Sequence, residues 1–403
     1  MLEDLEHGVA SNGLRYGFYR VESESAAICI AARGGSSFEP PGKYGIAHLT
    51  EHMIFRGNEY LQDGELDRAV ELSGGEANAY TTRELILLCA EFVSDSLARV
   101  AEKLFLAVSA RRLVEGEFER ERAVVEAEVK GLISSPESRI YRLAHASAWG
   151  DSHLGRPIEG YPETVANISK ADVEEYKASV FSPERMSLAI VGRISRLEAL
   201  RVVKLFSQLE PGGKVREPET PEPRTTFLRE ERGIEAAYAA LTLPLPPRSG
   251  LANVLARLRG VVFNLEAGAT SILFKEVREE RGLAYGFNVD VHITSWGSSM
   301  SLIVLEGNRD RVGELFDAMT RSLERALRGG YPESEWREGR RRLYRFYTRR
   351  EAISNMERAD ALSAVILFHE KPFTLEDLVN QTLSSEWSLE EFLRLPRGLA
   401  LIV

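Results

Sequence analysis

The sequence has little cysteine, no long apolar run and no excess of positive charge. Its 403 residues include two cysteines, Cys29 and Cys89, each inside an apolar segment. This setting favours two buried thiols over a disulfide and excludes a thiolate metal site. No apolar run approaches the ~18 residues of a membrane span. Because 61 acidic residues outnumber 51 basic ones, the formal charge is −10, which argues against nucleic acid as the main partner.

What remains is the composition of a soluble globular protein, with 44% hydrophobic and 28% charged residues. At ~100–200 residues per domain, the length predicts two to four domains. The first residues, MLEDLEHGVASNG, are acidic and match neither a secretion signal nor an organelle transit peptide. The sequence therefore predicts a cytoplasmic protein that does not enter a membrane.

Proline and glycine interrupt the chain most strongly near its middle. The segment EPGGKVREPETPEPRTT contains four prolines and two glycines, which break both helical and strand periodicity. We therefore predict a linker at residues 213–225. It separates an N-terminal domain at residues 1–212 from a C-terminal domain at residues 226–403.

Apolar patterns predict both strands and helices in each half. In the first half, strands are predicted at RYGFYRVES, SAAICIAARGG and residues 85–93 and 186–191, and helices at residues 46–55, 94–113 and 117–133 and from Ala171. In the second half, a strand is predicted at IEAAYAALTLPLP and helices at residues 251–265, 318–327 and 333–356. Both halves close with a helix, a turn and an apolar strand. We therefore expect an α+β fold made of two homologous domains, each with an antiparallel-rich sheet packed against helices.

Two histidines four residues apart mark the segment GIAHLTEHMIFRG, where Glu51 lies between His48 and His52. At about 100° per residue, these three side chains occupy one arc of a helix whose opposite arc is apolar. This spacing brings two imidazole nitrogens together on one ion, as in zinc-binding helices. An ordinary solvated helix face is the alternative, because such motifs also arise by chance. A catalytic zinc ion takes three protein ligands, so one more must come from elsewhere.

The segment EFERERAVVEAEVKGLI supplies several carboxylates, which helical geometry separates. The predicted buried stripe consists of Phe118, Val124, Val125, Val129 and Leu132. Glu121 and Glu128 lie within this stripe, nearly two turns apart. Buried carboxylates need partners. Glu128 is therefore a candidate third zinc ligand, and Glu121 a nearby carboxylate that orients or balances the site. The alternative is a buried salt bridge to an arginine.

Together these residues resemble the inverzincin metallopeptidases of the pitrilysin, insulysin and mitochondrial-processing-peptidase family. In that family a glutamate about 75 residues beyond the histidine motif completes the zinc site. Here 128 − 52 = 76 leads to Glu128. The family's ER-containing helix is matched by Glu121 and Arg122. The resemblance covers essentially the whole chain and implies two homologous α+β domains that form half of a clamshell chamber.

Two further motifs imply contacts with a substrate. The family's NAYT strand is matched by Asn78, Ala79, Tyr80 and Thr81. An extended peptide could bind there as an added strand, through its main chain. A shifted form of the family's R-x-x-x-x-GLAY pattern, in LFKEVREERGLAY, places Arg278 and Tyr285 seven residues apart. In the family this pair contacts the substrate peptide.

The resemblance implies a zinc endopeptidase that acts on peptides or unfolded segments, with one Zn2+ per chain. The two histidines of the motif and Glu128 would hold the ion, and Glu51 is the candidate general base. Full-length family members enclose their substrate with four such domains, whereas this chain has two. The resemblance therefore implies a homodimer in which Arg278 and Tyr285 act in trans.

Three alternatives accompany this interpretation. A non-catalytic family member that serves as a scaffold or partner subunit would keep the fold, but such relatives usually lack a ligand or the base, and all four are present here. The ligand types express a preference for zinc that also admits cobalt or manganese. Pairing with a related chain is the alternative to a homodimer.

Overall fold

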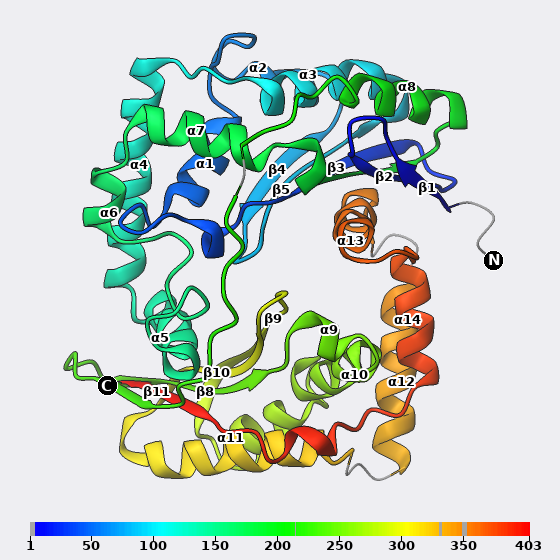
Figure 1. Cartoon of the computed structure of the whole chain (residues 1–403). Coiled ribbons are helices and arrows are strands. Elements are labelled where there is room, and N and C mark those ends of the chain that lie inside the picture. Colours follow the sequence, from blue (N-terminus) through cyan, green and yellow to red (C-terminus); the bar gives the residue numbers. More distant parts are fainter. Residues whose placement is uncertain (1–4, 214, 330–332, 349–352) are drawn as a thin grey trace. The chain divides into compact units, whose positions relative to one another are not determined.

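A computed structural model describes residues 5–213, 215–329, 333–348 and 353–403 of the chain (Figure 1). The chain forms two compact units, each discontinuous in sequence. Unit 1 contains the described residues of 1–130, 157–217 and 353–375, and unit 2 those of 131–156, 218–352 and 376–403. The described part of the predicted linker has neither helix nor strand; residue 214 of that linker lies outside the described residues.

Each half of the sequence contributes one helix to the unit formed mainly by the other half. Helix α5 (Pro136–Trp149) precedes the linker but belongs to unit 2, and helix α13 (Asn355–Phe368) follows the linker but belongs to unit 1. A division of the chain at the linker alone therefore does not describe how these two helices pack.

Unit 1 is built on a six-stranded sheet with the order β1-β2-β6-β3-β5-β4. Its strands are β1 (Leu5–Val9), β2 (Arg15–Arg20), β3 (Ser25–Arg33), β4 (Glu76–Thr81), β5 (Leu85–Val93) and β6 (Met186–Gly192). All neighbours pair antiparallel except β2 and β6, which are parallel. Strand β4 is therefore an edge strand of a largely antiparallel sheet.

Unit 2 is built on a five-stranded sheet with the order β7-β11-β8-β10-β9. Its strands are β7 (Phe227–Glu230), β8 (Ala236–Leu245), β9 (Ala284–His292), β10 (Ser298–Asn308) and β11 (Gly398–Ile402). Strands β7 and β11 pair parallel and the others antiparallel. Both the order and the directions repeat those of β2-β6-β3-β5-β4 in unit 1. The two units thus share one topology, as the predicted duplication requires, and the edge strands β4 and β9 are equivalent.

Helices cover both faces of the unit 1 sheet. Successive strand residues point to opposite faces. On β4, the Tyr80 hydroxyl lies 2.7 Å from a carboxylate oxygen of Asp360 on α13, whereas Thr81 faces α1 (Ile46–Ile54). The other helices of this unit are α2 (Glu65–Glu71), α3 (Leu97–Ser109), α4 (Glu115–Ser134), α6 (Pro162–Ala166), α7 (Lys170–Val180) and α8 (Arg196–Phe206). Alpha-helices α1 and α13 therefore lie on opposite faces of one sheet.

The two cysteines form a disulfide, so the prediction of two buried thiols is wrong. Cys29 on β3 and Cys89 on β5 stand directly opposite each other in the antiparallel ladder, with their Cα atoms 4.1 Å apart. They lie beneath α13, in a cluster with Ala359, Leu362 and Ile366. The sequence shows that both segments are apolar, but the pairing depends on the register between two strands separated by 60 residues.

In unit 2, α5 and the remaining helices cover opposite faces of the sheet. Ile140 and Leu143 of α5 pack on Ala240 and Ile303, whereas the neighbouring Leu241 faces the larger core. The remaining helices are α9 (Arg248–Leu251), α10 (Leu255–Glu266), α11 (Val312–Leu327), α12 (Glu333–Thr348) and α14 (Leu375–Ser384). Short single-turn helices lie at Ser36–Phe38, Ser94–Ser96, Pro183–Arg185, Arg309–Arg311 and Glu390–Phe392, and a π-helix at Phe274–Glu279. None of the described helices is long and apolar enough to cross a membrane.

One long predicted helix is divided in the structure. The pattern at residues 333–356 predicts a single helix, but α12 ends at Thr348 and α13 begins at Asn355. Ser354 caps α13, because its hydroxyl accepts a hydrogen bond from the main-chain N–H of Glu357, whose side chain in turn accepts one from the Ser354 N–H. This capping box fixes a new helix start. Residues 349–352 of the prediction lie outside the described residues.

Candidate metal centre

Helix α1 is held at its N-terminus by a buried carboxylate. Gly45 precedes the helix with a φ of 98°, a conformation that glycine adopts readily. The Oε1 atom of Glu39 accepts hydrogen bonds from the main-chain N–H groups of Gly45 and Ala47 at 2.9 and 3.0 Å. A carboxylate at this end satisfies free N–H groups and complements the helix dipole. The helix that carries His48, Glu51 and His52 is therefore fixed where it begins.

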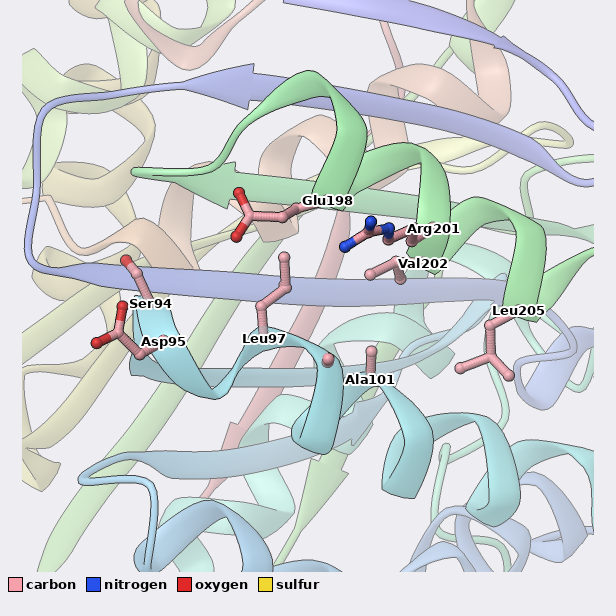
Figure 2. A pocket seen from close by; sticks show the side chains of 9 residues that line it. Ser94, Asp95, Leu97, Ala101, Glu198, Arg201, Val202 and Leu205 are labelled. Carbon is pink, nitrogen blue, oxygen red and sulfur yellow. The ribbon is translucent and has the colours of Figure 1, made fainter.

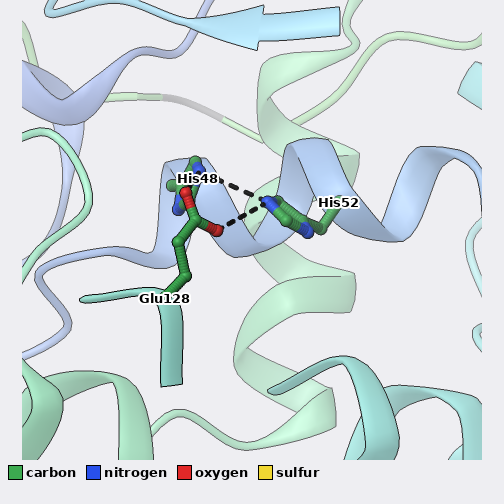
Figure 3. A group of neighbouring side chains, drawn as sticks. All are labelled: His48, His52 and Glu128. Atoms are coloured by element: carbon green, nitrogen blue, oxygen red, sulfur yellow. Dashed lines mark hydrogen bonds and ion pairs between the residues drawn. The ribbon is translucent and has the colours of Figure 1, made fainter. Parts of the chain in front are cut away.

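The structure brings His48, His52 and Glu128 together (Figure 3). The two Nε2 atoms lie 3.3 Å apart. The carboxylate oxygens of Glu128, on α4, lie 3.9 Å from Nε2 of His48 and 3.6 Å from Nε2 of His52. Tetrahedral ligands at zinc distances are separated by ~3.3–3.4 Å, so these spacings fit three ligands of one ion. The donor set, two imidazole nitrogens and a carboxylate, also fits zinc.

Glu121 fixes the orientation of His52. Its Oε1 lies 2.8 Å from Nδ1 of His52, and its Oε2 lies 2.8 Å from Nε of Arg56. Because an ionised carboxylate only accepts hydrogen bonds, Nδ1 carries the proton and Nε2 presents its lone pair toward Glu128. Sequence reasoning missed Arg56, which lies two residues beyond the end of α1, so helical periodicity gave no signal for this contact.

Glu51 lies beside this group but is not part of it. Its Oε2 accepts a hydrogen bond of 2.8 Å from the hydroxyl of Thr81 on β4. Burial raises the pKa of the Glu51 carboxyl, and the hydrogen bond from Thr81 opposes that rise. A carboxyl with a raised pKa is better matched to proton transfer near neutral pH.

The electrostatics of the site favour a cation. Burial, together with the neighbouring His52 ring, lowers the pKa of His48 to about 3, so its imidazole is neutral, as metal ligation requires. Burial also raises the pKa of Glu128; nearby His52 opposes this rise, and Glu159 and Glu121 add to it. Carboxylates that repel one another in a partly buried site gain most from a positive ion.

The buried stripe of α4 is narrower than predicted. Glu121 is buried, as predicted. Val124 is 54% exposed and the side chain of Glu128 is 41% exposed, so the prediction that Val124 and Glu128 lie in the buried stripe is wrong. The buried residues of this helix are Phe118, Glu121, Val125 and Val129. With Glu121 at zero and about 100° per residue, these residues span about 0–80°, whereas Val124 and Glu128 lie near 300° and 340°. Glu128 therefore stands at the rim of the stripe, open to solvent.

The predicted substrate strand, Asn78 to Thr81, forms most of the edge strand β4. Its residues alternate between exposed and partly buried along Glu76–Thr81. One side of β4 pairs with β5, and the other has no strand partner among the described residues. Such an edge presents main-chain N–H and C=O groups to an incoming strand.

Arg278 and Tyr285 are neighbours within unit 2. The guanidinium carbon of Arg278, in the π-helix, lies 4.3 Å from the ring centroid of Tyr285 at the start of β9. This is a cation–π contact. Tyr285 is nevertheless 68% exposed. The pair forms one exposed feature next to an edge strand.

Unit 1 also has a hollow of about 200 Å³ that shares none of these residues. It lies between the start of α3 and α8 (Figure 2) and is lined by Ser94, Asp95, Leu97, Ala98, Ala101, Glu198, Arg201, Val202 and Leu205. Its lining contains no histidine and no cysteine.

Two family models match this chain. Residues 20–161 match "Insulinase (Peptidase family M16)", and residues 167–343 match "Peptidase M16 inactive domain". The chain belongs to peptidase family M16. It is 28% identical to the "Uncharacterized zinc protease YmxG" of Bacillus subtilis over 315 residues, which are 77% of this chain and 75% of that one. It is 32% identical to the rat mitochondrial-processing peptidase subunit beta over 198 residues, 48% of this chain and 40% of the rat protein.

Solved structures show the same fold. A protease from Helicobacter pylori superimposes with a TM-score of 0.86 at 18% identity, covering 99% of both chains. A "peptidase M16 inactive domain" from Pseudomonas fluorescens gives a TM-score of 0.86 at 16% identity, covering 99% of this chain and 97% of the other. The predicted α+β fold of two similar domains is therefore confirmed.

Proposed function

We propose that this chain is a zinc-dependent endopeptidase that hydrolyses peptides or unfolded polypeptide segments. The observation that carries the proposal is the convergence of His48, His52 and Glu128 with Glu51 beside them. Relatives named zinc proteases support it. His48, His52 and Glu128 would hold one Zn2+ per chain. When bound, zinc acts as a Lewis acid that polarises a carbonyl and makes water acidic enough to act as a nucleophile near neutral pH.

The chain's own residues supply positioning and proton transfer. Glu51 is the general base: its carboxylate accepts a proton from the attacking water and returns it to the leaving amine. Thr81 keeps the carboxylate in place through its hydroxyl. Glu121 holds His52 in the tautomer whose Nε2 is free to bind a metal.

The free edge of β4 is the proposed binding place for an extended substrate. A peptide added to this edge would pair through its main chain, which gives affinity with little sequence preference. Asn78, Ala79, Tyr80 and Thr81 would line it. Thr81 contacts Glu51, so the end of this strand lies next to the proposed base.

The active assembly is proposed to be a homodimer in the cytoplasm, in which two chains together form a closed chamber. Arg278 and Tyr285 of one chain would contact the substrate bound at the metal centre of the other. The mutual stacking and exposure of this pair support a role in binding. Arginine and tyrosine together can stabilise the charge that develops on a substrate carbonyl.

Hydrolysis of a quenched fluorescent peptide by the purified chain tests the proposal. Activity should disappear with a chelator and return with added Zn2+. Glu51→Gln should still bind about one ion at the α1 site but lose about 10²-fold or more in kcat. Glu126→Gln, on α4 and away from the site, is the matched control and should keep full activity. A metal-loaded chain that cleaves no peptide would favour the non-catalytic scaffold or partner subunit instead.

A further inference from the structure

A second group of metal-binding side chains lies in unit 2, at residues that the proposed peptidase does not use. Asp290 and His292 alternate on the edge strand β9 and so point to the same face of the sheet. His145 reaches them from α5, which covers that face. The three side chains offer one ligand atom each, all within 4.8 Å of one another.

One oxygen of Asp290 lies close to a ring nitrogen of each histidine. Oδ2 of Asp290 lies 3.3 Å from Nε2 of His145 and 3.0 Å from Nε2 of His292. Ligands in a tetrahedral zinc site are separated by ~3.3–3.4 Å. Both separations are shorter than those between Glu128 and the two Nε2 atoms at the α1 site, which are 3.9 and 3.6 Å. The ligand types are also the same: two imidazoles and one carboxylate.

The surroundings isolate these groups from water on one side. The side chain of His145 is 5% exposed, and those of Asp290 and His292 are 23% and 25% exposed. Apolar residues of α5 cover the rest of this sheet face. On β10, Ser299 stands opposite His292 and Ser301 stands opposite Asp290. The Ser301 hydroxyl lies 3.0 Å from that of Thr242 on β8, and all three of these hydroxyl-bearing residues are buried.

A hydroxyl supports the orientation of the buried ring. The Ser299 Oγ lies 3.5 Å from Nδ1 of His145, so Nε2 is the nitrogen turned toward Asp290. In metal sites, a hydrogen bond from the ring nitrogen that does not bind the metal commonly orients the histidine.

This group is not a repeat of the metal centre in unit 1. Strands β4 and β9 are equivalent, and α13 and α5 each cover one face of their sheet. The place in unit 1 that corresponds to β9 beneath α5 is β4 beneath α13, where Tyr80 bonds to Asp360. The histidine pair of α1 lies on the opposite face. The group in unit 2 therefore arises from its own residues.

We propose that His145, Asp290 and His292 form a second site for a divalent metal ion, of the class that prefers imidazole and carboxylate ligands, such as Zn2+. One position of the ion remains open on the partly exposed side, for water or another small ligand. Because the ligands come from α5 and β9, the ion joins the helix that unit 2 receives from the first half of the chain to the edge strand of its sheet.

Metal counting with site-specific variants tests this site. Bound metal is removed from the purified full chain with a chelator, and the chain is then equilibrated with Zn2+ by dialysis. Inductively coupled plasma mass spectrometry measures the number of zinc ions per chain. We expect two ions per chain in the wild type, one in His145→Gln/His292→Gln and one in His48→Ala/His52→Ala. His7→Gln/His369→Gln, which removes two histidines outside both groups, should keep two. Unchanged Zn2+ content in His145→Gln/His292→Gln would overturn the proposal and leave the proposed peptidase untouched.

A second measurement separates metal binding from loss of the fold. In the His48→Ala/His52→Ala chain only the second site remains, so added Zn2+ should raise Tm through that site. Adding Asp290→Asn, which keeps the shape of the side chain, should abolish the rise while circular dichroism stays unchanged. If Zn2+ shifts Tm equally with and without Asp290→Asn, the three residues are a metal-free hydrogen-bonded network and the proposal is wrong.

Discussion

Glu121 and His52 are joined by a 2.8 Å contact between a carboxylate oxygen and Nδ1 of the ring. The other oxygen of Glu121 pairs with Arg56, and the glutamate side chain is 8% exposed. The carboxylate is therefore held from both sides. It dictates which nitrogen of His52 faces Glu128 without itself belonging to the group of three ligands.

Glu121→Gln should weaken Zn2+ binding at the α1 site by about 10–100-fold. An amide can donate as well as accept, so it no longer selects the tautomer of His52, and it loses the charge that pairs with Arg56. Competition with a chromophoric chelator measures the affinity. Glu119→Gln, two residues earlier on α4 and half-exposed, is the matched control and should bind as the wild type does. Equal affinities of the two variants would remove Glu121 from the site.

Glu128→Gln should cost more than Glu121→Gln, because it removes a charged ligand instead of a group that orients one. The two histidines alone leave an incomplete set of ligands. Atomic absorption after gel filtration should find the α1 site empty in this variant, with activity lost in parallel. Because the side chain is 41% exposed, the fold should be retained, with Tm close to that of the wild type in the absence of metal. Zn2+ retained at the α1 site would rule out Glu128 as the third ligand.

Helical periodicity was sufficient to anticipate how the histidine pair is arranged. A spacing of four residues predicts that His48 and His52 share one face, and their Nε2 atoms do approach to 3.3 Å. The same periodicity indicated that Glu121 and Glu128 lie on one side of α4, but not how wide the buried stripe is. That width depends on which neighbours pack on the helix, and local sequence does not contain this information.

Contacts between distant segments were the features that the sequence did not reveal. The disulfide requires Cys29 and Cys89 to stand opposite each other in two strands, and the exchange of α5 and α13 between units requires both sheets to be formed. The group of His145 and Asp290 brings together residues 145 positions apart. Patterns within one element predict which face is apolar, whereas pairing between elements is set by tertiary structure.

Complementation between two defective chains tests action in trans. Glu51→Gln keeps Arg278 and Tyr285, whereas Arg278→Ala/Tyr285→Phe keeps the metal centre and its base. If the pair acts across a homodimer, one site of each mixed dimer is intact, and mixing equal amounts should restore up to about one quarter of wild-type activity. Mixing Glu51→Gln with Glu128→Gln should restore nothing, since no site is then complete. No recovery in the first mixture, with subunit exchange verified by native mass spectrometry, would place the pair in cis or outside the mechanism.

Lys177 on α7 provides a prediction for the dependence of stability on pH. It is buried, and its ammonium group donates hydrogen bonds to the main-chain oxygens of Ala107 and Ala110 at 2.7 and 2.6 Å, at the C-terminal end of α3. Such donors satisfy the last carbonyls of a helix. Burial lowers the pKa of this lysine from 10.5 to about 7, and the positive charge of the nearby Arg111 makes a smaller contribution in the same direction. The folded chain therefore releases this proton at a lower pH than the unfolded chain.

Between about pH 7 and pH 10 the unfolded state binds the Lys177 proton and the folded state does not, so the contribution of this lysine to the free energy of unfolding rises with pH. Below about pH 7 both states are protonated and the contribution is constant. Urea unfolding gives the free energy of unfolding of the wild type and of Lys177→Met at each pH. The wild-type value minus the variant value should rise across this window, because the titration of all other groups is common to both chains and cancels. Lys204→Met, at an exposed position, should show a constant difference. A constant difference for Lys177→Met as well would mean that the two carbonyl oxygens stabilise the ammonium enough to cancel the effect of burial.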